Sequence, residues 1–281
     1  MRRFIDILRL IRATNCLIAS AGVWVGAYLT WSWPEYYGPT VVSIAAFLAC
    51  AAGNILNDLM DTEADKINRP TRVLVAGRLS RRFARNLMIT LNVIALIMGI
   101  AVSWEVALTG FVTIGLLVAY NRTLKRIPLL GNAVVALLAS LTFVTGGLAI
   151  DPELTFRLPG PMIASVFAFF FHLVREIVKD VQDMEGDRRA GLSSLPLVIG
   201  PSRSLLAATG LFALLAVLTY IPIFAGWFGR AYEIITVYVV DLPILALLVV
   251  TWGFPDAKML AVASRALKVG MILGLLALIL A

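Results

Sequence analysis

Apolar stretches long enough to cross a bilayer follow one another along almost the whole chain, with short polar or turn-forming segments between them. A helix needs roughly 20 apolar residues to span the hydrocarbon core of a membrane. Gly and Pro occur in several separators, where a helix is expected to end. The pattern predicts an all-α, polytopic membrane bundle of nine transmembrane helices, at Asn15–Trp31, Thr40–Asn57, Asn86–Ser103, Val106–Tyr120, Asn132–Ile150, Pro161–Ile177, Ser204–Phe224, Tyr232–Val250 and Met259–Leu280.

The composition leads to the same class of protein. Hydrophobic residues make up 60% of the 281 residues, charged residues make up 15%, and the mean hydropathy is +0.91. A soluble domain would carry roughly a quarter charged residues, so that class is excluded. The arginines before the first apolar stretch resemble the start of a signal peptide. That stretch has full spanning length and eight more follow it, so we expect a retained first helix and a single domain over residues 1–281.

The basic residues favour one side of the predicted bundle. If the nine helices cross the membrane in alternate directions, 22 of the 24 Lys and Arg residues fall at the N-terminus and around the connections after the second, fourth, sixth and eighth helices. This side is cytoplasmic by the positive-inside rule, which predicts a cell-membrane protein with its N-terminus inside and its C-terminus outside. The pI near 9.7 thus reflects topology and attraction to anionic membrane lipids. No nucleic-acid motif accompanies these charges, and no protein partner is implied.

Soft-ligand metal sites and histidine chemistry are not expected. The only histidine is His172, and Cys16 and Cys50 lie in apolar stretches without metal-ligand spacing. These counts argue against a zinc site and a His-based triad. Asp241 lies in the middle of the eighth predicted helix, where an ionisable group is costly. No partner for it is evident from the sequence, and we leave it outside the catalytic set.

Two cytoplasmic segments, Asp58–Arg85 and Val178–Arg203, are longer than the other connections, and a repeated pattern of oxygen-bearing side chains lies where each begins. Each pattern has the spacing i, i+4, i+7, i+11, which places its members within an arc of about 60° on a helix. Recurrence of the pattern four helices later predicts an internal repeat of a four-helix unit. We name them the first ladder, at 54–65 (Asn54, Asp58, Asp61, Asp65), and the second ladder, at 176–187 (Glu176, Asp180, Asp183, Asp187).

The two ladders predict a divalent cation, because carboxylates stacked at helical spacing repel one another. Carboxylate and amide oxygens suit Mg²⁺, which shares its coordination with substrate phosphates. Two ladders facing each other would hold a diphosphate through Mg²⁺, and solvated surface charge is the alternative. The glycine and glutamate spacing of a calcium EF-hand is missing. We expect the metal ligands to be Asn54, Asn57, Asp61, Asp65, Asp180, Asp183 and Asp187, and the catalytic carboxylates to be Asp58, Asp61, Asp180 and Asp183.

The ladders and their flanks resemble a known superfamily. Asn57 directly precedes Asp58 of the first ladder, and the ladder is followed by Asn68-Arg69-Pro70, with Arg72 and Gly77-Arg78 downstream. This run resembles the first signature of the UbiA superfamily of intramembrane prenyltransferases, and Asp180-x-x-Asp183-x-x-x-Asp187 resembles its second signature. Nine helices in a chain of this length are similar to that superfamily as well. Within it, Leu10–Leu17 and Arg175–Arg188 resemble the archaeal digeranylgeranylglyceryl phosphate synthases.

The resemblance implies an activity. A geranylgeranyl group would pass from its diphosphate to the glycerol hydroxyl of geranylgeranylglyceryl phosphate, a lipid acceptor, with release of pyrophosphate. The resemblance also implies that Arg69, Arg72 and Lys125 contact the prenyl diphosphate, since guanidinium groups suit phosphate oxygens. For Arg72 and Lys125 the alternative is ordinary cytoplasmic charge.

The acceptor needs a base and a partner for its phosphate. Asp180 or Glu176 is a candidate base for the glycerol hydroxyl, and Arg175 or Lys179 is a candidate partner of the acceptor phosphate.

Other functions remain open at this point. An aromatic acceptor such as 4-hydroxybenzoate, homogentisate or a chlorophyllide-like molecule would need the same metal chemistry. A membrane transporter can also contain internal repeats, but it would place its charged residues near the bilayer midplane. Here the carboxylates gather at one face. A soluble chain-elongating prenyl synthase is excluded by the hydropathy.

Overall fold

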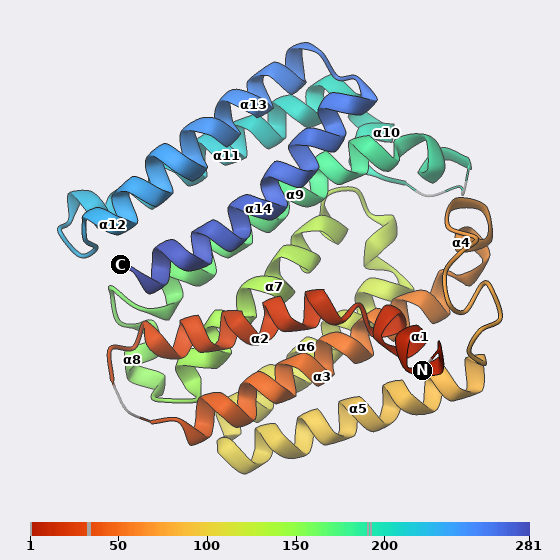
Figure 1. Cartoon of the computed structure of the whole chain (residues 1–281), viewed down its shortest axis with the longest axis horizontal. Coiled ribbons are helices and arrows are strands. Elements are labelled where there is room, and N and C mark those ends of the chain that lie inside the picture. The colour runs from red at the N-terminus through yellow and green to blue at the C-terminus, as the bar shows by residue number, and fades with distance from the viewer. Residues whose placement is uncertain (1, 33–34, 190, 192) are drawn as a thin grey trace. The chain divides into compact units, whose positions relative to one another are not determined.

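The computed structural model describes residues 2–32, 35–189, 191 and 193–281, and every regular element in them is a helix (Figure 1). Eight helices of this described part are long and apolar enough to cross a membrane. A ninth span results if α1 (Arg2–Ile11) and α2 (Ala13–Tyr28), which are bent by 53° relative to each other, are counted as one. The protein is therefore a multi-pass, all-α membrane protein, and the predicted fold class is confirmed.

The chain forms two compact units, Met1–Leu124 with Leu141–Phe156, and Lys125–Ser140 with Arg157–Ala281. The helix α7 (Leu130–Leu148) contributes its first part to the second unit and its last part to the first. Besides α1 and α2, the first unit contains α3 (Tyr37–Met60), α4 (Thr62–Asn68), α5 (Arg81–Val102), α6 (Trp104–Arg122) and α8 (Pro152–Phe156). The second contains α9 (Pro161–Arg189), α10 (Leu195–Ile199), α11 (Pro201–Phe224), α12 (Arg230–Glu233), the π-helix η2 (Ile234–Asp241), α13 (Leu242–Gly253) and α14 (Ala257–Ile279).

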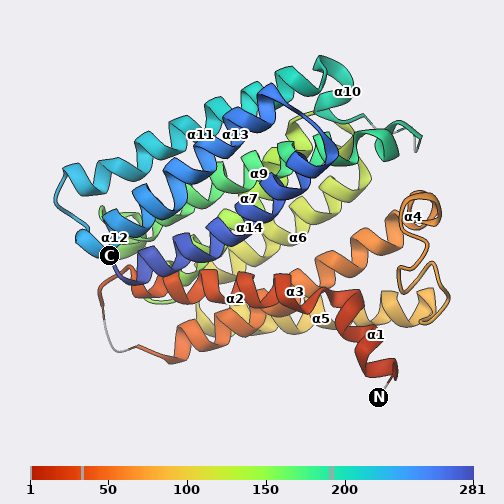
Figure 2. The ribbon, with the colours of Figure 1, turned by 45° about the horizontal axis from the view of Figure 1, so that its top comes forward.

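Glycines allow the helices of the first unit to approach closely. A Cβ atom on Gly26 would lie 2.1 Å from the Phe143 carbonyl oxygen, and one on Gly146 would lie 2.0 Å from the Val23 carbonyl oxygen. Small residues at such crossings let the backbones of membrane helices meet. The helix α3 lies beside α2, α5 and α6 in this unit (Figures 1 and 2). A buried apolar cluster joins α2, α3, α6 and α7 through Val23, Val42, Val106, Val144 and Leu148.

In the second unit α9 packs against α11 and α14, and α13 packs against the same two helices. The core of this unit includes buried residues from all four helices, among them Ile177, Phe212, Leu248 and Leu267. This packing fixes α9, which carries the second ladder.

A polar contact inside the second unit involves Asp241. The Thr219 hydroxyl on α11 donates to the Asp241 carboxylate at 2.7 Å, and the Tyr232 hydroxyl donates to the Thr219 carbonyl at 3.1 Å. Asp241 ends the π-helix η2, directly before the helix that contains Pro243, which has no N–H to offer the preceding turn. Thr219 is thus the partner that the sequence did not reveal.

The expected long connections prove to be largely helical. Helix α9 runs to Arg189, well beyond the expected end at Ile177, so the segment from Val178 to Arg203 begins as a continuation of the helix. In the segment Asp58–Arg85, α3 continues to Met60 and the short helix α4 follows. The predicted membrane spans stop short of these helix ends because polar, charged turns beyond the apolar stretch lack the hydrophobic pattern that defines a span. For α9, the helix that the spacing of the second ladder predicts is present.

Candidate functional site

The first ladder lies on two helices that meet at Asp61. Helix α3 ends there, with Asp61 at φ −93° and ψ 9°, and α4 begins at the next residue. The Asp61 N–H donates to the Asn57 carbonyl at 2.9 Å, and the Asp65 N–H donates to the Asp61 carbonyl at 2.8 Å. The ladder is therefore not one continuous helical face, which corrects the geometry expected from its spacing.

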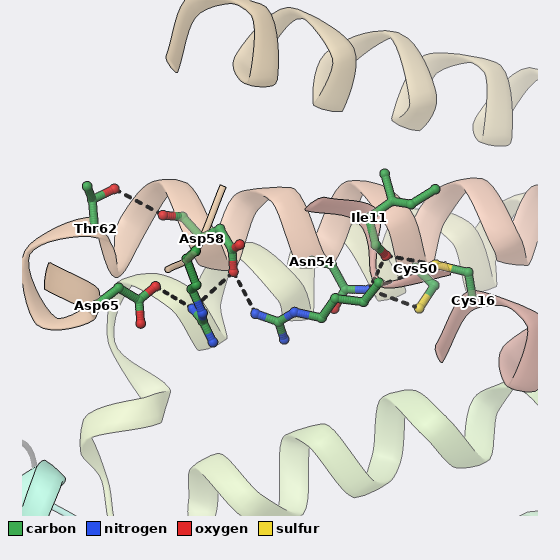
Figure 3. A network of polar contacts seen from close by, with 9 residues as sticks. Ile11, Cys16, Cys50, Asn54, Asp58, Thr62 and Asp65 are labelled. Carbon is green, nitrogen blue, oxygen red and sulfur yellow. Dashed lines mark hydrogen bonds and ion pairs between the residues drawn. The ribbon is translucent and has the colours of Figure 1, made fainter. Parts of the chain in front are cut away.

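Two arginines converge on the first ladder. Arg12 Nη2 lies 2.6 Å from Asp58 Oδ1, and Arg72 Nη1 lies 3.1 Å from the same oxygen. Arg72 also pairs with Asp65. The Asp58 and Asp65 side chains are only 7% and 9% exposed, and Figure 3 shows both as members of this polar network. Burial raises the pKa of the Asp65 carboxyl above its ordinary value, and the Arg72 guanidinium opposes that shift.

Apolar anchors hold the loop that carries Arg72. Val73, Leu74 and Leu79 are buried against Ile55 of α3 and Leu10 of α1 in one cluster. A positive φ of 66° at Gly77 turns the chain back toward α5, a conformation that glycine adopts without steric cost. The loop is therefore fixed by packing, so that Arg72 is held beside the ladder.

Asn54 fastens the junction between α1 and α2. The two helices are separated at Arg12, which has a left-handed conformation with φ 52°. The Asn54 side-chain amide donates to the Ile11 carbonyl at 2.9 Å (Figure 3), and the Cys16 thiol donates to the same oxygen at 3.2 Å. These bonds satisfy a carbonyl that the helix break exposes. The Asn54 amide nitrogen thus has a structural task, and its role as a metal ligand stays a prediction.

A cavity of about 370 Å³ lies next to this network in the first unit. It is bounded by Asp58, by Arg69 and Arg72 of the loop after α4, and by residues near the end of α1. The residues predicted to contact a diphosphate from this unit, Arg69 and Arg72, therefore lie at one cavity with the ladder carboxylate Asp58.

The second ladder lies on one unbroken helix, α9. Glu176, whose side chain is 12% exposed, pairs with Arg175 and with Lys179 Nζ at 3.2 Å. The Asn132 amide of α7 donates to the Asp180 carboxylate at 2.9 Å. Asp183 and Asp187 are half-buried further along the helix. The three residues predicted to serve the acceptor, Arg175, Glu176 and Lys179, thus form a contiguous ion-paired group.

The ladders fit Mg²⁺ by the chemistry of their donors. Among the residues that the structure describes, no three His, Cys, Asp or Glu side chains are grouped closely enough to hold a metal ion by themselves. Mg²⁺ does not need such a cage, because it is usually bound by one or two carboxylates together with waters and substrate phosphates. In this structure the buried carboxylates Asp58 and Asp65 form ion pairs with Arg12 and Arg72. Their negative charge is the charge that a Mg²⁺ ligand needs.

The structure brings some predicted residues together and adds others. Asp58, Asp65 and Arg72 are in direct contact. Lys125 lies in the short 3₁₀ helix η1 (Leu124–Arg126) at the boundary of the two units, and its role stays a prediction. The sequence reasoning assigned no role to Arg12, Asn132, Arg9 or Arg78. In the sequence, Arg9 and Arg12 stood out only as basic residues before the first apolar stretch, because Arg12 lies outside α1, at the helix break.

Known proteins similar to this chain were found by sequence. The family model described as "UbiA prenyltransferase family" matches residues 16–272. The digeranylgeranylglyceryl phosphate synthase of Methanopyrus kandleri is 36% identical over 273 residues, which are 96% of each chain. The protein of the same name from Natronomonas pharaonis is 34% identical over 84% of each chain.

Similar folds were also found among solved structures. A structure described as that of digeranylgeranylglyceryl phosphate synthase in membranes has a TM-score of 0.80 and 29% identity, and the match covers 99% of this chain and 98% of that one. A UbiA homologue from Archaeoglobus fulgidus bound to GPP and Mg²⁺ has a TM-score of 0.69 at 20% identity, covering 97% and 99% of the two chains. At that identity the second likeness concerns the fold.

Proposed function

Because this chain belongs to the UbiA prenyltransferase family, as its ladders predicted, we propose that it transfers a geranylgeranyl group from geranylgeranyl diphosphate to the glycerol hydroxyl of geranylgeranylglyceryl phosphate. Pyrophosphate is the second product. The observation that carries this proposal is the match over 96% of both chains to a digeranylgeranylglyceryl phosphate synthase, together with one carboxylate ladder in each unit. Family membership favours prenyl transfer over the transporter that the sequence left open.

The diphosphate is held, in this proposal, by the ladders and by nearby arginines. Arg69 and Arg72 border the cavity beside Asp58 and offer guanidinium forks to phosphate oxygens. Mg²⁺, when bound, supplies the positive charge that stabilises the leaving pyrophosphate. The predicted ligands are Asn54, Asn57, Asp61, Asp65, Asp180, Asp183 and Asp187.

The glycerol hydroxyl of the acceptor is served by residues of α9. Asp180, oriented by the Asn132 amide, is the candidate base for the glycerol hydroxyl, with Glu176 as the alternative. Glu176 is already paired with Arg175 and Lys179, which lowers its availability as a base and favours Asp180. Cleavage of an allylic diphosphate leaves a delocalised carbocation, so water must be kept away from the reacting carbon.

The proposed orientation places both ladders and the N-terminus in the cytoplasm. The support is the excess of Lys and Arg on that side of the bundle. A protease added to sealed inverted vesicles should cut the exposed segment around Arg188 and Arg189, whereas it should leave that segment intact in right-side-out vesicles.

A direct transfer assay tests which molecule is the acceptor. Purified protein with Mg²⁺ and labelled geranylgeranyl diphosphate is given either geranylgeranylglyceryl phosphate or 4-hydroxybenzoate, and labelled product and pyrophosphate are measured. Label in the glyceryl phosphate lipid, with pyrophosphate formed in equal amount, supports the proposal. Transfer to 4-hydroxybenzoate alone would replace it with an aromatic acceptor.

A further inference from the structure

The cavity beside the first ladder extends past Asp58 to arginines that have no assigned task. Besides Arg69 and Arg72, its lining includes Arg9 and Arg12 near the end of α1 and Arg78 of the loop before α5. Five arginines therefore line this space, and Asp58 is the one acidic residue among the described residues of its lining. Its volume of about 370 Å³ has room for on the order of ten water-sized groups, which suits a phosphate with a glycerol backbone.

The arginines of this lining differ in their partners. Arg12 and Arg72 are engaged by Asp58 of the first ladder. In the part of the chain that the structure describes, the Arg9 side chain makes no hydrogen bond or ion pair. Arg78 pairs with Asp6 of α1 at 3.2 Å and donates to the Thr71 carbonyl at 2.7 Å. A guanidinium has five N–H donors, so Arg78 keeps donors for a ligand.

We propose that Arg9 and Arg78 bind the phosphate of a glycerol phosphate lipid and thereby select the acceptor, an inference that rests on the proposed function. A phosphomonoester carries a charge of about −1.5 to −2, and guanidinium groups bind such oxygens with two parallel hydrogen bonds. Neither Arg9 nor Arg78 is paired with a ladder carboxylate. They would hold an anion without the metal that the ladders serve, so they differ in chemistry from the diphosphate-binding groups Arg69 and Arg72, which line the same cavity.

The position of Arg9 on α1 points to a lipid phosphate. Phe4, Ile5 and Leu8 of the same helix are exposed at 64%, 40% and 37%, whereas Leu10 and Ile11 are buried in the core. A helix with one apolar face outward and basic residues beside it lies in the membrane interface. A lipid that lies along this face would have its phosphate at the level of Arg9 and its chain in the membrane.

Binding of a non-reacting pair of lipids tests this site. The full chain in detergent is titrated with 1-oleoylglycerol 3-phosphate, with monooleoylglycerol, and with geranylgeranyl diphosphate. We expect Arg9→Gln to weaken binding of the phosphate lipid about tenfold, which is ~1.4 kcal/mol, and to leave the other two ligands unaffected. Arg9→Gln removes no hydrogen bond or ion pair of the described residues, so we expect folding to be preserved. Arg82→Gln, an exposed arginine of α5 outside the cavity lining, is the matched control.

Further outcomes separate the site from the reaction. Arg78→Lys keeps the positive charge but loses the paired N–H donors of the guanidinium group. It should therefore weaken binding of the phosphate lipid, but by less than Arg9→Gln does. In the transfer assay, Arg9→Gln should raise the KM for the acceptor with kcat unchanged. Equal losses for the lipid and the diphosphate, or no loss for the lipid, would overturn the proposed site. Selective lipid binding without any transfer would refute the proposed function and leave the site standing.

Discussion

Removal of Arg72 should destabilise the first unit and make it dependent on Mg²⁺. Arg72 is 17% exposed and bridges Asp58 and Asp65, which are 7% and 9% exposed. Removing one partner of a buried ion pair costs about 3–5 kcal/mol. Asp58 keeps its contact with Arg12, so we expect Arg72→Ala to cost ~3 kcal/mol, at the lower end of that range. The Tm should fall by roughly 5 °C or more.

Thermal unfolding in detergent, with and without Mg²⁺, measures both effects. A cation at Asp58 and Asp65 takes over the charge of Arg72, and an ion at 100 times its Kd stabilises by about 2.7 kcal/mol. The Arg72→Ala variant should therefore regain most of its lost stability when Mg²⁺ is added. Arg82→Ala, at an exposed position, should change stability by no more than ~0.5 kcal/mol. Equal Tm values for the two variants, or an equal response to Mg²⁺, would refute the reasoning.

Three further outcomes are expected. Gly146→Ala should lower stability by ~1–3 kcal/mol, because the new Cβ meets the Val23 carbonyl; Gly115→Ala, which meets nothing within 4 Å, should not lower the Tm. Asn54→Ala should speed proteolysis of the junction between α1 and α2, since the Ile11 carbonyl loses its donor at 2.9 Å, and an unchanged cleavage rate would contradict that role. Chelation by EDTA should abolish prenyl transfer and excess Mg²⁺ should restore it; transfer that persists in EDTA would exclude the ladders as metal sites.

The regular features of the fold could be predicted from the sequence. Apolar stretches of spanning length predicted every membrane helix from α3 to α14, because a helix that crosses the bilayer needs such a stretch. The first predicted span, Asn15–Trp31, corresponds to α2, which is only 16 residues long and follows a bend at Arg12. A left-handed arginine cannot be read from hydropathy. It depends on Asp58 and Asn54, which are distant in the sequence and contact the junction from α3.

Some of the residues predicted for the site, Asp58, Asp65 and Arg72, are in contact in the structure, and the functional roles of the predicted residues stay predictions. The spacing of the first ladder predicts one uniform helix through Asp58 and Asp65, whereas α3 ends and α4 begins at Asp61. Arg12 and Arg78 had the appearance of ordinary cytoplasmic charges. The position of Arg78 at the cavity follows from packing of Val73 and Leu79, and that of Arg12 follows from its contact with Asp58. These are tertiary effects that spacing along one helix does not contain.

The central claim is that the two ladders serve the cleavage of the prenyl diphosphate, and pyrophosphate release by ladder variants tests it most directly. Asp61→Asn and Asp183→Asn are compared with Glu63→Gln and Glu185→Gln, neighbouring carboxylates that are 84% and 60% exposed and paired with Lys66 and with Arg188 and Arg189. With geranylgeranyl diphosphate, geranylgeranylglyceryl phosphate and Mg²⁺, each ladder variant should lose at least about 100-fold in rate, or ~2.7 kcal/mol, while both controls keep wild-type activity. Ladder variants that are folded and release pyrophosphate as fast as the controls would contradict the account.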